Sequence, residues 1–119
     1  MGRGVVELVK RCVMVLGEVC CIKIDHKIGS VDENGLYYPI NVGYISKDDF
    51  EDTRTIVYLL GVTDPVTEYN GEYIALVKCL GEEDKIVCAP FGFELSNDQI
   101  AQEISFIDPY CSIERPVNI

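Results

Sequence analysis

Short apolar runs separated by turn-forming residues make up most of this chain. The runs are rich in β-branched and aromatic residues, and several are closed by glycine or proline. This pattern is typical of buried strands rather than of amphipathic helices. It predicts strands over Val19–Ile24, Thr55–Leu60 and Lys85–Ala89, with extended segments over Leu36–Tyr38 and Gly43–Ile45.

The dipeptide Asn70-Gly71 stands between two further apolar stretches. Asn-Gly accommodates the positive φ angles of a two-residue reversal, so it favours a β-hairpin. We therefore expect residues 66–69 and 72–78 to be its two arms.

One helix is expected near the C-terminus. Ser96 and Gln99 have the spacing of a capping box, which starts a helix. Ile100 and Ile104 then share one face, and Asp108-Pro109 marks the expected end. Many short strands and one late helix predict an α+β, mainly β domain, in which a helix packs on a small barrel.

Composition narrows the possible partners. The chain has 119 residues, enough for one domain, and a net charge of -10. Such a charge repels nucleic acid and anionic membranes, so neither is an expected partner. No apolar run approaches the roughly 18 residues that span a bilayer. Lys10 and Arg11 interrupt the apolar start of the chain, and a cytoplasmic location is expected.

The six cysteines contain no Cys-x-x-Cys pair, and His26 is the only histidine. A standard zinc spacing therefore cannot be written. We expect reduced cysteines that act as small hydrophobic residues. The adjacent pair Cys20-Cys21 should point to opposite faces of its strand. His26 itself is expected to be a solvent-exposed residue of a turn.

Several motifs occur together in a characteristic order. They are Ile24–Ser30 (IDHKIGS), Tyr37–Ile45 (YYPINVGYI), Tyr58–Val62 (YLLGV), Pro65–Gly71 (PVTEYNG) and Glu83–Pro90 (EDKIVCAP). Over residues 16–110 the chain resembles the soluble, family I inorganic pyrophosphatases, and most of all a short bacterial subgroup of them. The resemblance implies a small five-stranded barrel of the oligonucleotide-binding type with one C-terminal helix packed on it.

The same resemblance suggests the domain limits. Residues 15–110 would form one pyrophosphatase-like barrel and residues 111–119 a tail. Residues 1–14 would be an extension, which is either a docking segment or the product of a translation start placed upstream of Met14.

Members of this family hydrolyse diphosphate with Mg²⁺ ions, which require clustered carboxylate oxygens. The resemblance places Glu51, Thr53 and Ile56 at the family's metal-binding aspartates, so only Glu51 keeps a carboxylate. Val42 replaces a phosphate-binding tyrosine. Asn41 and Gly43 match the family at positions that are largely structural.

If the site is active, the resemblance nominates a small set of residues. Glu51 and Lys85 would be catalytic, and Tyr44, Lys85 and Tyr110 would bind substrate. Mg²⁺ would be held by Glu51, Asp52, Glu83 and Asp84, with Glu82 nearby.

Two hypotheses about function follow. In the first, the chain is a divergent homologue whose hydrolysis is lost or weak. It would act as a binding or interaction module, through self-association on an exposed barrel face. In the alternative, it is a Mg²⁺-dependent phosphohydrolase with a rebuilt acidic site, acting on pyrophosphate or a small phosphate compound. A working site requires at least three carboxylates converging beside Lys85. A lapsed site requires Ile56 and Val42 in the old pocket.

Overall fold

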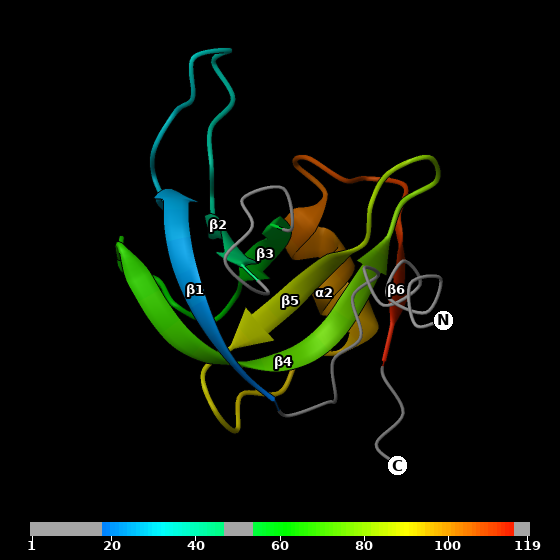
Figure 1. Cartoon of the computed structure of the whole chain (residues 1–119). Helices are drawn as coiled ribbons and strands as arrows, with labels where there is room; N and C mark the ends of the chain where they lie inside the picture. The colour runs from blue at the N-terminus through cyan, green and yellow to red at the C-terminus, as the bar shows by residue number, and fades with distance from the viewer. Residues whose placement is uncertain (1–17, 47–53, 116–119) are drawn as a thin grey trace, which may run out of the picture.

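The computed structural model describes residues 18–46 and 54–115 (Figure 1). Its elements are β1 (Val19–His26), β2 (Asn41–Ser46), β3 (Arg54–Leu59), β4 (Glu68–Lys78), β5 (Lys85–Ala89), α2 (Asn97–Ile104) and β6 (Ser112–Glu114). The expected strands at β1, β3 and β5 are confirmed. Among the described residues, no helix is long and apolar enough to cross a membrane.

The strands close into a barrel. The sheet order is β1-β2-β3-β5-β4-β6. Strand β4 also pairs with β1, so the first five strands in this order form a closed ring. The β3–β5 pairing is parallel, whereas the other pairings are antiparallel. The expected five-stranded, mainly β barrel with one helix is therefore confirmed.

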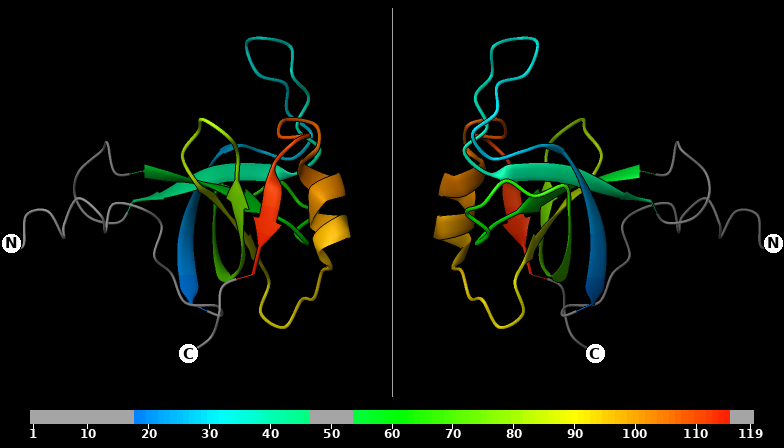
Figure 2. Two further views of the ribbon diagram at one scale, coloured as in Figure 1. Left: turned by 90° about the vertical axis from the view of Figure 1, so that its right-hand side faces the viewer. Right: turned by 90° about the vertical axis from the view of Figure 1, so that its left-hand side faces the viewer.

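Helix α2 lies against the outside of the barrel beside β6 (Figure 2). The expected capping box is present: the Ser96 side chain accepts from the Gln99 backbone N–H, and the Gln99 side chain accepts from Ser96 N–H. Ile100 and Ile104 are buried. The helix ends at Ile104, earlier than expected, and residues 105–107 form turns.

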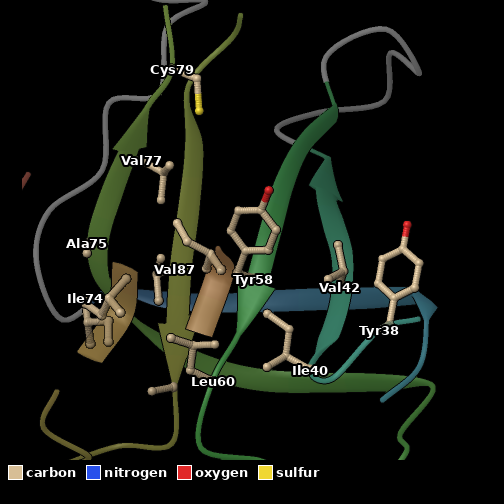
Figure 3. Close-up of a cluster of buried hydrophobic side chains, with 13 residues drawn as sticks. Tyr38, Ile40, Val42, Tyr58, Leu60, Ile74, Ala75, Val77, Cys79 and Val87 are labelled. Carbon is tan, nitrogen blue, oxygen red and sulfur yellow. The ribbon is translucent and has the colours of Figure 1, made fainter. Parts of the chain in front are cut away.

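Alternation along the strands sorts the apolar side chains into two clusters. Val57 and Leu59 of β3 belong to one, and Tyr58 belongs to the other, which also contains the two helix isoleucines. Figure 3 shows the second cluster, with Tyr58 near its centre. Successive side chains of a strand point to opposite faces, so β3 contributes to both cores.

The predicted hairpin at Asn70-Gly71 is wrong. Residues 68–78 form one continuous strand, β4, and Gly71 pairs with Cys20 of β1. A Cβ at Gly71 would lie 3.2 Å from the carbonyl oxygen of Ala89. The glycine therefore allows neighbouring backbone to approach closely, and it does not turn the chain.

Two further expectations are corrected at the C-terminal end. Cys79 and Cys111 form a disulfide with a Cα–Cα distance of 4.5 Å, whereas sequence spacing favoured reduced thiols. Cys79 directly follows Lys78, and Cys111 directly precedes Ser112. Because Lys78 and Ser112 pair between the antiparallel strands β4 and β6, the fold places the two cysteines opposite each other. Residues 112–114, expected in a tail, are strand β6.

The other expectation about cysteines is met. Cys20 is buried and Cys21 is exposed, as alternation along a strand predicts.

Candidate functional site

A concavity of about 260 Å³ opens on the face of β2 and β3 that carries Val42 and Tyr58. It is lined by Asp25, His26, Tyr38, Val42, Gly43, Tyr44, Arg54, Ile56, Tyr58, Lys85 and Ile107. Strands β2 and β3 supply most of these residues, and β2 contains the second half of the YYPINVGYI motif. The fold thus brings two expected site residues, Tyr44 and Lys85, to one place.

Asn41 fixes the loops beneath this concavity. Its side chain is fully buried, and its Oδ1 accepts from the N–H of Ile28 at 2.9 Å. Its Nδ2 donates to the carbonyl oxygens of Val62 and Asp64 at 3.3 and 3.0 Å. One amide therefore joins three segments of the chain, which confirms the structural role expected for Asn41.

Gly43 allows strands β1 and β2 to approach each other. A Cβ at this position would lie 1.9 Å from the carbonyl oxygen of Lys23. Backbone cannot yield at such a distance without separating the strands. The glycine of the motif is therefore required by packing.

Lys85 is held by carboxylates. Its Nζ donates to Glu82 Oε1 at 2.8 Å and to Asp108 Oδ2 at 3.0 Å. The Tyr58 hydroxyl also donates to Asp108 Oδ2. Asp108 is only 7% exposed, so its carboxylate is largely removed from water. Hydrogen bonds from Lys85 and Tyr58 offset the cost of burying this charge.

Sequence reasoning missed Asp108 because Asp108-Pro109 matched a helix-ending signal. A buried aspartate and an exposed one have the same local pattern, and only the tertiary fold distinguishes them. The available hint was that Phe106-Ile107 immediately before it is apolar.

The electrostatics of this cluster favour the protonated states of both donors. Burial, together with the hydrogen bond to Asp108, raises the pKa of Tyr58 far above its usual range. Burial on its own would lower the pKa of Lys85, but the hydrogen bonds to Glu82 and Asp108 outweigh it and raise that pKa. Lys85 is thus a firmly charged ammonium paired within the protein.

Val42 and Ile56 line the same concavity. Val42 is 6% exposed and belongs to the apolar cluster of Figure 3, whereas Ile56 is 44% exposed. At these positions the resemblance expects a phosphate-binding tyrosine and a metal-binding aspartate. Neither aliphatic side chain can ligate a cation or donate to a phosphate.

Two contacts that involve aromatic rings lie in the lining of the concavity. The Arg54 guanidinium lies 4.3 Å from the centroid of the Tyr44 ring, a cation–π arrangement. His26 stacks on Tyr38 with ring centroids 4.4 Å apart. The expectation of a simply exposed His26 is therefore corrected, because the histidine is half-buried at the end of β1 and faces the site.

The remaining candidates among the described residues do not line this concavity. Tyr110 is 95% exposed and lines neither concavity. Glu83 and Asp84 line a second concavity of about 390 Å³, with Glu82, Gly81, Ile56 and Lys85. Glu51 and Asp52 lie outside the described residues.

The described residues do not fit a Mg²⁺ ligand set. Asp84 pairs with Lys78 at 3.7 Å, and Glu82 and Asp108 pair with Lys85. Within residues 18–46 and 54–115, the group of three potential ligands that converges is Cys79, Asp108 and Cys111, which includes a single carboxylate. Octahedral Mg²⁺ requires several oxygen ligands.

Comparison with known proteins supports the fold. A crystal structure of inorganic pyrophosphatase from Ehrlichia chaffeensis superposes with a TM-score of 0.55 at 15% sequence identity, covering 87% of this chain and 90% of that one. No protein-family model and no curated protein matches the chain. The barrel is therefore pyrophosphatase-like in architecture.

Proposed function

We propose that this protein is a pyrophosphatase-fold binding module that does not hydrolyse diphosphate. The observation that carries the proposal is the pair of aliphatic side chains, Val42 and Ile56, in the wall of the 260 Å³ concavity. Hydrolysis in this fold needs metal ions to acidify water and neutralise the substrate. Ile56 stands where the resemblance places a metal-binding aspartate, so one ligand for these ions is missing.

The ligand that best suits the walls is a small phosphate monoester. Arg54 offers a guanidinium, which binds phosphate through two parallel N–H groups. Val42, Ile56 and Ile107 provide an apolar wall for an organic group. In this proposal binding depends on Arg54 and the tyrosine rings and requires no metal ion.

Binding is tested by titrating the full chain with phenyl phosphate and with inorganic phosphate, in the presence of EDTA. Phenyl phosphate should bind more tightly because its ring covers the apolar wall. Arg54→Gln should weaken binding at least about tenfold, since it removes a charged hydrogen-bond donor. The matched control is Lys27→Gln, which alters an exposed residue outside the concavity. Equal loss in both variants, or no binding at all, would refute the proposal.

Hydrolysis is tested by phosphate release from pyrophosphate with millimolar Mg²⁺ or Mn²⁺. We expect no release above a buffer blank from the unmodified chain, and partial activity from an Ile56→Asp, Val42→Tyr double variant. Turnover by the unmodified chain that Glu83→Gln abolishes would instead establish the alternative, a rebuilt acidic site. The acidic lining of the second concavity is the feature that favours this alternative.

A further inference from the structure

The disulfide between Cys79 and Cys111 lies beside the Lys85 cluster. The two Sγ atoms and a carboxylate oxygen of Asp108 all lie within 4.8 Å of one another. Asp108 also precedes Cys111 by three residues, so the disulfide fixes the segment that carries this aspartate. The bond thus connects the end of β4 to the segment that carries Asp108, the residue that pairs with Lys85.

The segment between α2 and β6 is held at both ends. At its start, the Asp108 N–H donates to the carbonyl oxygen of Ile104 at 2.9 Å. At its end, the Cys111 bond to Cys79 adds to the three residue pairs between β4 and β6. Besides the disulfide, this short strand and the hydrogen bonds of Arg115 to Asn97 and Ile74 hold the end.

Cys111 is the more exposed of the two bonded cysteines. Cys111 is half-buried, whereas Cys79 is 9% exposed. Their chain neighbours Leu80 and Tyr110 are 101% and 95% exposed, so the chain beside each cysteine lies at the surface. An incoming thiolate would therefore reach the Cys111 sulfur first.

We propose that Cys79 and Cys111 form a reversible thiol–disulfide site that sets how firmly Asp108 holds Lys85. The co-reactant is a dithiol, either a small molecule or a protein. Its first thiolate attacks Cys111 Sγ, the S–S bond breaks, and Cys79 leaves as a thiolate and takes up a proton. The second thiol of the donor then displaces Cys111, giving two protein thiols and one donor disulfide, with two electrons transferred to the protein.

Reduction should change the charge presented to the concavity. In the oxidised protein, Asp108 and Glu82 neutralise Lys85. When the segment around Asp108 loosens, the Lys85 ammonium can turn toward a bound anion near Arg54. This consequence rests on the proposed function, because it requires an anion in the concavity. The reversible bond itself does not.

The bond is tested by equilibrating the native full chain in glutathione buffers of different oxidation state, alkylating it, and identifying the modified peptides by mass spectrometry. We expect Cys79 and Cys111 to gain and lose the alkyl group together as the buffer changes. A Cys21→Ser variant is the control, since Cys21 is exposed and outside the pair. Thiols that stay alkylatable in excess oxidised glutathione, or a bond that excess dithiothreitol cannot reduce in the native protein, would overturn the proposal.

The coupling is tested by titrating phenyl phosphate into the oxidised protein, the reduced protein and a Cys79→Ser, Cys111→Ser variant, all in EDTA. The reduced protein and the variant should bind about tenfold more tightly than the oxidised protein, and Lys85→Met should remove the difference. Equal affinity in both redox states would overturn the control by Asp108. No binding in any state would refute the proposed function. The alkylation experiment would still show whether the Cys79–Cys111 bond is reversible. Stoichiometric Zn²⁺ uptake by the reduced protein, lost in the double serine variant, would replace the switch with a metal site.

Discussion

Tyr58 and Asp108 are fifty residues apart in the sequence, and the tyrosine hydroxyl donates a hydrogen bond to the aspartate inside the protein. Lys85 donates to the same carboxylate. Strand β3, strand β5 and the segment after α2 are thereby joined by one buried charge. The cost of burying that charge is offset only while its donors remain in place.

Removal of Lys85 should therefore be strongly destabilising. Lys85→Met leaves the Asp108 carboxylate buried without its counter-charge, at an expected cost of about 3–5 kcal/mol in the free energy of unfolding. Lys78→Met is the control, because the Lys78 side chain is 39% exposed, far more than that of Lys85, and pairs with Asp84 at 3.7 Å. It should cost about 1 kcal/mol or less. Urea denaturation measures both, and equal costs would contradict the arrangement described.

Stability should fall at alkaline pH. The pKa values of Tyr58 and Lys85 are raised above their ordinary values of 10.0 and 10.5. The folded protein then binds more protons than the unfolded chain above about pH 10, so the free energy of unfolding falls as pH rises. The contribution is fully present below pH 10. Urea denaturation between pH 8 and about pH 11 measures the slope, and Tyr58→Phe should reduce it.

The control for the alkaline slope is Tyr37→Phe. Tyr37 is 55% exposed, whereas Tyr58 is 1% exposed. Its replacement should leave the slope unchanged. An identical slope in the Tyr58→Phe variant would show that the buried hydroxyl does not account for the alkaline loss.

Asn41 offers a test of the loops beneath the concavity. Asn41→Ala leaves the N–H of Ile28 and the carbonyl oxygens of Val62 and Asp64 without their partner. Because all three hydrogen bonds are partly buried, the expected cost is about 1–3 kcal/mol. The exposed Asn70→Ala is the matched control. Thermal unfolding compares the two, and a similar loss for Asn70→Ala would count against a special role for Asn41.

Gly43→Ala should disrupt the pairing of β1 with β2. The added Cβ would meet the Lys23 carbonyl oxygen, which is backbone, so the strands must separate. We expect a loss of about 3 kcal/mol or more, at the upper end for overpacking. Gly71→Ala is a graded comparison, since its Cβ would meet Ala89 at 3.2 Å. Calorimetry should rank Gly43→Ala as the more destabilised, and the reverse order would contradict the packing described.

Much of the fold was predictable, since local pattern and tertiary structure agree there. The limits of β5 and the Ser96–Gln99 capping box match the sequence prediction. Gly71 was misassigned because a glycine between neighbouring strands and a glycine in a turn have the same sequence signature. Its function depends on Ala89, which lies 18 positions away.

The candidate site was predictable only in part. Lys85, Tyr44, Val42 and Ile56 do meet at one concavity. Asp108 and the Cys79–Cys111 bond were not foreseen, because each depends on where β6 lies. Strand β6 is only three residues long, too short to produce a recognisable alternation of apolar and polar residues.

Strand β6 also has a consequence for solubility. It occupies the rim of β4 along Leu76–Lys78, where amide and carbonyl groups would otherwise be open to another molecule. Unpaired rims of this kind recruit strands from other chains and initiate aggregation. A chain truncated after Cys111 should therefore keep its barrel but form polymers by adding strand to strand, so residues 112–114 protect the molecule from its own copies.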